Sequence, residues 1–154
     1  MMIADVMTAF PETLSPEDTI HKAAQMMRDH DYGSLPIVDD LGVLVGIVTD
    51  RDIVVKSLAS GHGLETELSD CMTTRPETIP KDLPIKDALR LMDKQQIRRL
   101  PVVENGRLIG MVSLSDLAKS QVPEGEKSRA LESVSAGGAD FRPGAELSES
   151  LSDF

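Results

Sequence analysis

The sequence is poor in cysteine, histidine and aromatic residues. Its one cysteine, Cys71, has no second cysteine for an internal disulfide, and one cysteine with three scattered histidines does not give the spacing of a structural zinc site. Aromatic residues make up 3% of the chain, so the stacking surfaces with which proteins read single-stranded bases are scarce. Disulfide scaffolds and zinc-stabilised folds are therefore excluded, and we expect aliphatic residues and methionine to form the core.

Long apolar runs and an excess of positive charge are also lacking. No segment approaches the roughly 18 apolar residues of a membrane span, and the N-terminus lacks the basic and apolar blocks of a signal peptide. The formal net charge of −10 repels polyphosphate, which disfavours nucleic acid as a partner but does not exclude a small anion in a locally basic pocket. We therefore expect a cytoplasmic protein with no membrane association.

The 154 residues have the composition of one globular domain, 40% hydrophobic and 27% charged, and they contain one unit twice. Met-Thr-Ala-Phe-Pro-Glu-Thr at 7–13 returns as Met-Thr-Thr-Arg-Pro-Glu-Thr at 72–78. Alignment of 6–40 with 71–105 and of 42–53 with 106–117 gives 16 identical pairs in 47. These identities are too many and too well ordered for chance, so we expect the two halves to share one fold.

Each half predicts the order strand, helix, strand, strand, helix. One amphipathic helix follows Ser15, which we expect to cap it, and another follows Asp82, the expected cap in the second half. Short β-branched runs predict strands at 35–38, 43–48, 100–103 and 107–112, and Asn105-Gly106 is a strong hairpin signal. Second helices are expected at 50–58 and 115–119.

These patterns divide the chain into a first repeat at 1–58, a linker at 59–69, a second repeat at 70–120 and a tail at 121–154. A half of about 55 residues buries too little surface to be stable alone, so we expect the two repeats to pack on each other. The tail is rich in Gly, Ser, Glu and Ala and carries a net charge of −4. Its composition predicts a largely disordered acidic segment.

The residues best suited to chemistry lie where a predicted strand runs into a predicted helix. A hydroxyl residue ends the strand and a carboxylate follows three positions later, as Thr49 and Asp52 in one half and Ser113 and Asp116 in the other. A carboxylate accepts two hydrogen bonds at once, which suits a vicinal diol such as that of ribose. The alternative interpretation is that these four side chains only cap the helices.

The duplicated motifs resemble a tandem pair of CBS domains, a Bateman module, over residues 3–119. The resemblance rests on Met-Thr-x-x-Pro, a helix, hydrophobic-Pro-hydrophobic-Val and Gly-hydrophobic-Val-(Thr/Ser)-x-x-Asp. Thr-Asp-Arg-Asp-Ile-Val in the first repeat and Arg-Arg-hydrophobic-Pro-Val in the second are similar to short stand-alone bacterial stress and hypoxic-response CBS proteins. The segment 112–116 is similar to a nucleotide-contacting stretch of AMP-activated kinase gamma subunits. The resemblance implies an α/β (α+β) fold of two pseudo-twofold repeats, each with a small sheet and two helices.

The resemblance also implies a sensor with two clefts that bind adenine nucleotides such as AMP, ADP or ATP, S-adenosylmethionine or cyclic dinucleotides. Thr49 and Asp52 would hold ribose in one cleft, and Ser113 and Asp116, with Ser115 between them, in the other. Phosphate would contact Arg98, with Arg99 beside it. The first repeat has Gly33 at the position equivalent to Arg98, and Arg51 is the basic residue that would compensate. Adenine would lie against backbone and apolar groups near Thr13, Pro36, Thr78 and Pro101.

Nothing in the sequence predicts catalysis, a metal site or a resident cofactor. No Ser/His/Asp or Cys/His set, phosphate loop or dinucleotide-binding fingerprint occurs. We therefore expect a non-enzymatic regulatory module that signals to an unidentified effector protein. The rival classes are a constitutive scaffold with empty clefts and an enzyme using the Asp50 and Asp52 carboxylates.

Two further expectations concern assembly and asymmetry. Small and flexible apolar residues on the first helix of each repeat predict a homodimer formed through these helices: Ala23, Ala24, Met27, Ala88 and Met92. The arginine pair of the second repeat has Gly33-Ser34 as its counterpart, so we expect the cleft of Asp116 to bind phosphorylated ligands more tightly. The alternative is that Arg98 reaches the opposite cleft, which would invert this assignment.

Overall fold

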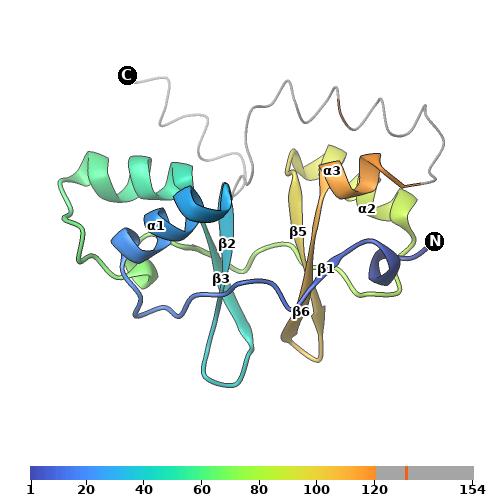
Figure 1. Cartoon of the computed structure of the whole chain (residues 1–154), viewed down its shortest axis with the longest axis horizontal. Coiled ribbons are helices and arrows are strands. Elements are labelled where there is room, and N and C mark those ends of the chain that lie inside the picture. The colour runs from blue at the N-terminus through green and yellow to red at the C-terminus, as the bar shows by residue number, and fades with distance from the viewer. Residues whose placement is uncertain (121–130, 132–154) are drawn as a thin grey trace. The chain divides into compact units, whose positions relative to one another are not determined.

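The computed structural model of the chain describes residues 1–120 and Leu131 (Figure 1). The tail predicted at 121–154 therefore lies, apart from Leu131, outside the described residues. The described chain is a mixed α/β fold with two small three-stranded sheets, as predicted. The first repeat contributes β1 (Thr8–Ala9), α1 (Ile20–His30), β2 (Ser34–Val38), β3 (Leu44–Thr49) and the π-helix η2 (Asp52–Ser57). The second contributes β4 (Thr73–Thr74), α2 (Ile85–Gln95), β5 (Arg99–Glu104), β6 (Arg107–Ser113) and α3 (Leu114–Ala118).

The first strand of each repeat pairs with the sheet of the other repeat. β4 lies antiparallel to β3, with Thr73 opposite Ile47, and β1 lies antiparallel to β6, with Thr8 opposite Met111. The strand orders are thus β2-β3-β4 and β1-β6-β5. Each sheet is therefore completed by a strand from a distant part of the sequence.

Two compact units follow from this exchange, and they do not coincide with the sequence repeats. One, which we call the Asp52 unit, consists of Phe10–Pro76 and Asn105–Leu108. The other, the Asp116 unit, consists of Met1–Ala9, Glu77–Glu104 and the described residues from Ile109 onward. The segment at 59–69, expected as a linker, belongs to the Asp52 unit, where Leu68 is fully buried and its N–H donates to the Asp18 carbonyl at 2.8 Å.

The two predicted helix caps, Ser15 and Asp82, are wrong. α1 is capped by Thr19, whose Oγ1 accepts from the Lys22 N–H at 3.1 Å, and α2 begins after Pro84 without a side-chain cap. Thr19 forms an isolated β-bridge with Glu67, and Pro84 forms one with Met2. These bridges hold Thr19 and Pro84 in an extended conformation. Because an extended residue cannot belong to a helix, each helix starts one residue after its bridge.

The predicted apolar faces of the helices point into the cores. Ile20, Ala23 and Met27 are buried on α1, and Ile85, Ala88, Leu89 and Met92 are buried on α2. Four of the five residues expected to form a dimer surface are thus part of a unit's own interior, and only Ala24 is exposed. These buried residues therefore offer no surface to a second chain.

A glycine in each sheet permits close approach of the exchanged strand. A Cβ added at Gly46 would lie 2.9 Å from the Thr73 carbonyl oxygen, and one added at Gly110 would lie 3.1 Å from the Thr8 carbonyl oxygen. Both contacts are with backbone atoms, which cannot swing aside as a side chain can. Close pairing of β4 therefore requires glycine at Gly46, and a side chain at Gly110 would push β1 outward by a few tenths of an ångström.

We expect Gly46→Ala to destabilise the chain by about 1–3 kcal/mol, because the added methyl pushes β4 away from β3. Urea unfolding followed by circular dichroism measures this change. Gly63→Ala is the control, since a Cβ at Gly63 meets no atom within 4 Å. Equal urea midpoints of unfolding for the two variants would show that the close approach at Gly46 does not contribute to stability.

Candidate functional site

The predicted hydroxyl and carboxylate pairs lie at the strand ends, and each pair closes a reciprocal helix cap. The Asp52 N–H donates to Thr49 Oγ1 and the Thr49 N–H donates to Asp52 Oδ2, both at 3.0 Å. In the other unit the Asp116 N–H donates to Ser113 Oγ at 3.1 Å, and the Ser113 N–H donates to Asp116 Oδ2 at 2.9 Å. The capping interpretation is therefore realised in both repeats, but each cap uses only one carboxylate oxygen.

The residues expected around adenine come together within each unit. The Leu14 N–H donates to the Pro36 carbonyl, and the Ile79 N–H donates to the Pro101 carbonyl, both at 3.0 Å. These bonds bring Thr13 beside Pro36 and Thr78 beside Pro101. Both threonines are exposed, whereas both prolines are buried.

The backbone also joins the expected phosphate residues to the helix starts. The Leu114 N–H donates to the Arg98 carbonyl at 2.7 Å, and the Asp50 N–H donates to the Gly33 carbonyl at 3.1 Å. Arg98 and Gly33 therefore hold equivalent places next to α3 and η2, and Arg99 opens β5. Two other expected contacts are exposed: Arg51, and Ser115, whose Oγ lies 3.0 Å from Ser113 Oγ.

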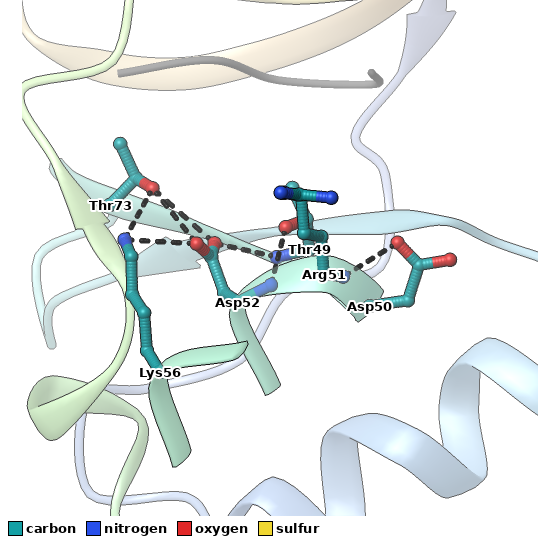
Figure 2. Close-up of polar contacts among 6 residues, drawn as sticks. All are labelled: Thr49, Asp50, Arg51, Asp52, Lys56 and Thr73. Atoms are coloured by element: carbon teal, nitrogen blue, oxygen red, sulfur yellow. Dashed lines mark hydrogen bonds and ion pairs between the residues drawn. The ribbon is translucent and has the colours of Figure 1, made fainter. Parts of the chain in front are cut away.

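In the Asp52 unit the carboxylate has two further partners that are not among the predicted site residues (Figure 2). Lys56 Nζ lies 2.9 Å from Asp52 Oδ1, and Thr73 Oγ1 lies 3.4 Å from Oδ1 and 3.3 Å from Oδ2. Lys56 Nζ also donates to Thr73 Oγ1 at 3.4 Å. We call Asp52, Lys56 and Thr73 the Asp52 cluster. Asp52 itself is 5% exposed.

One member of the Asp52 cluster had a detectable sequence signal, and the other did not. Lys56 follows Asp52 by four positions, the spacing of an ion pair on a helix. Its counterpart in the second repeat is Ser120, so comparison of the repeats marks it as a difference. Thr73 comes from the second repeat and reaches Asp52 only through the β3–β4 pairing, which sequence spacing does not reveal.

The Asp116 carboxylate has a different environment. Asp116 is partly exposed, and within residues 1–120 no cation lies at ion-pair distance from it. Its Oδ2 accepts the capping bond from Ser113, and Oδ1 accepts no hydrogen bond from the described part of the chain. Asp116 thus presents one carboxylate oxygen to an incoming donor, while both oxygens of Asp52 are engaged.

Cys71 lies in the core of the Asp52 unit. Burial raises the pKa of its thiol, and the neighbouring Asp52 carboxylate raises this pKa further, while Lys56 partly offsets the rise. A raised pKa keeps the thiol protonated and unreactive at neutral pH. This environment agrees with a packing role for Cys71.

We expect Lys56→Met to destabilise the chain by about 1–3 kcal/mol, because it leaves a buried carboxylate without its countercharge. Chemical denaturation measures the loss. Lys22→Met is the matched control: Lys22 also pairs with an aspartate four positions away, Asp18, but its side chain is 55% exposed. Removal of an exposed pair costs roughly 0–1 kcal/mol, so a Lys56→Met effect no larger than the control would contradict the assigned pairing.

The sequence profile of the CBS domain matches residues 3–58 and 68–122. Hypoxic response protein 1 of Mycobacterium tuberculosis is 37% identical over 121 residues, covering 78% of this chain and 84% of that protein. The predicted similarity to stand-alone hypoxic-response CBS proteins is thereby confirmed. A crystal structure of Hypoxic Response Protein I with two coordinated zinc ions superposes with a TM-score of 0.72 at 35% identity, covering 80% of this chain and all of that one.

Two structures of CBS proteins with adenosyl ligands are also similar to this chain. The CBS domain pair of protein MJ0100, in complex with 5′-methylthioadenosine and S-adenosyl-L-methionine, has a TM-score of 0.70 at 32% identity, covering 77% of this chain and 98% of that one. CBSX2 in complex with AMP has a TM-score of 0.70 at 26% identity, covering 77% of this chain and 93% of that one.

Neither a metal-binding cluster nor a membrane-spanning helix occurs among the described residues. No three His, Cys, Asp or Glu side chains there cluster as a metal ion would require. None of the helices in the same residues has the length and apolar character to cross a bilayer.

Proposed function

The chain belongs to the CBS-domain family and carries the domain twice, and on this premise we propose that it is a non-enzymatic regulatory module that binds an adenosyl ligand such as AMP, ADP or ATP. Ligand binding would change how the module engages an effector protein in the cytoplasm. The observation that carries the proposal is the Asp116 carboxylate, which has an oxygen available beside Ser113 at the end of β6.

The chemistry of this position supports ribose as the group recognised. A carboxylate oxygen accepts a hydroxyl proton, and a charge-assisted bond of this kind contributes roughly 1.5–3 kcal/mol. The similar structures with AMP, and with 5′-methylthioadenosine and S-adenosyl-L-methionine, hold ligands that share an adenosyl group. Arg98, tied by its carbonyl to Leu114 at 2.7 Å, is the residue we assign to phosphate, and Gly33 cannot serve that role in the first repeat.

A constitutive scaffold is the second candidate function. It is favoured by the reciprocal caps, because Thr49, Asp52, Ser113 and Asp116 all stabilise helix starts without any ligand. The two functions differ in one measurable respect, which is whether an adenosyl ligand stabilises the folded chain.

We expect AMP to raise the melting temperature of the wild-type chain, since a ligand at about 100 times its Kd stabilises by about 2.7 kcal/mol. Asp116→Asn retains an oxygen for the Ser113 cap but loses the charge, so we expect an affinity loss of about tenfold or more. Calorimetric titration measures it, with Asp87→Asn on α2 as the charge-matched control. If AMP, ADP, ATP, S-adenosylmethionine, cyclic-di-AMP and NAD all leave the melting temperature unchanged, the scaffold is the better description.

We also propose that the chain is a homodimer. Val54 on η2 and Leu58, the residue directly after η2, are apolar and are 55% and 48% exposed, which makes them the candidate contact in place of the buried alanines and methionines. Light scattering at micromolar concentration is expected to give twice the monomer mass of 16.7 kDa. Val54→Glu with Leu58→Glu should give the monomer mass, and Leu41→Glu, on an exposed turn, should not; a wild-type monomer would refute the dimer.

A further inference from the structure

The two ribose carboxylates of the proposed function are not equivalent acceptors. A carboxylate offers about four lone-pair positions on its two oxygens. On Asp52, Oδ1 meets Lys56 Nζ and Thr73 Oγ1, and Oδ2 meets the Thr49 N–H and the same Thr73 hydroxyl. Because a hydroxyl has a single proton, these three donors take three of the four positions, so fewer than two remain for the two hydroxyls of a diol.

The Thr73 hydroxyl occupies the place that a ribose hydroxyl would need. Its distances of 3.4 and 3.3 Å to the two oxygens put it astride the carboxylate edge, where a bidentate donor binds. Lys56 Nζ donates to Thr73 Oγ1 at 3.4 Å, so the ammonium orients the hydroxyl with its proton toward Asp52 (Figure 2). Lys56 thus both neutralises the carboxylate and fixes the group that covers it.

Comparison of the repeats indicates that Lys56 causes the difference between the two carboxylates. Thr73 has Thr8 as its counterpart, and Asp52 has Asp116, so the carboxylate and the threonine occur in both halves. Of the three residues of the Asp52 cluster, only Lys56 has a counterpart of another type, Ser120, which carries no positive charge. Within the described residues, Asp116 makes no hydrogen bond with Thr8, although β1 pairs with β6 as β4 pairs with β3.

We infer that Lys56 is a specificity-determining residue that closes the Asp52 carboxylate to ribose. The chain then takes one adenosyl ligand, at the Asp116 unit, and the Asp52 unit rejects the diol. To bind there, a ligand would have to displace Lys56 and return a half-buried ammonium to water while leaving the carboxylate buried, which opposes binding. This inference rests on the proposed function, because it concerns how many sites accept the proposed ligand.

The test is calorimetric titration of the full chain with AMP and, separately, with 2′-deoxy-AMP, which lacks one hydroxyl of the diol. We expect one AMP per wild-type chain and two per Lys56→Ser chain, with the added site weakened about tenfold or more for 2′-deoxy-AMP. Lys56→Ser also removes a positive charge near a phosphorylated ligand, so a gain of binding cannot come from general electrostatics. Lys22→Ser is the matched control, because it breaks the Lys22–Asp18 pair at the same spacing on α1 and should keep one site.

Variants of the carboxylates test the inference without relying on Lys56→Ser. In the wild-type background, Asp52→Asn should leave AMP affinity within about twofold, whereas Asp116→Asn should lower it about tenfold or more. Three outcomes would overturn the role of Lys56 and leave the proposed function standing. They are binding of two AMP per wild-type chain, a loss of AMP affinity in Asp52→Asn equal to that in Asp116→Asn, and a folded Lys56→Ser chain with one site. Absence of AMP binding by every variant and by the wild type would overturn the proposed function together with this inference.

Discussion

The antiparallel pairing of β4 with β3 is the contact on which the first site depends. It brings Thr73, a residue of the second repeat, to the carboxylate of Asp52 in the first. Gly46 makes the pairing possible, because any larger residue would meet the Thr73 carbonyl. A two-residue strand therefore has a consequence beyond the sheet: it helps to satisfy the buried charge of Asp52.

Duplication has preserved the scaffold and allowed the sites to diverge. Both repeats end a strand in a hydroxyl, cap the next helix with it and link the helix start to the residue before the neighbouring strand. These features are backbone-directed, so they tolerate many changes in the surrounding side chains. The divergent positions, Lys56 against Ser120 and Gly33 against Arg98, are those whose side chains set the local charge. A single scaffold can thus carry one open and one covered carboxylate.

Capping and ligand recognition are compatible because they use different atoms of the same group. One carboxylate oxygen satisfies a backbone N–H that would otherwise lack a partner at the helix start. The second oxygen can bind another group. In one unit it contacts Lys56 and Thr73, and in the other no cation of the described chain lies at ion-pair distance from it. The cap also restrains the carboxylate, which would reduce the entropy lost on binding of the proposed ligand.

The sequence by itself determined the duplicated fold, the order of its elements, the amphipathic helices and the paired hydroxyls and carboxylates, because each of these is a local pattern of period or spacing. The helix starts after Thr19 and Pro84, the exchange of β1 and β4 and the engagement of Asp52 by Thr73 were decided only in the tertiary structure. They depend on bridges between residues far apart in the chain, and such pairings leave no trace in local periodicity. Ser15 and Asp82 look like caps in isolation, but the chain turns near them, and the bridges of Thr19 to Glu67 and of Pro84 to Met2 keep the residue before each helix extended. Tertiary hydrogen bonds thus outweighed a local preference worth about 1 kcal/mol.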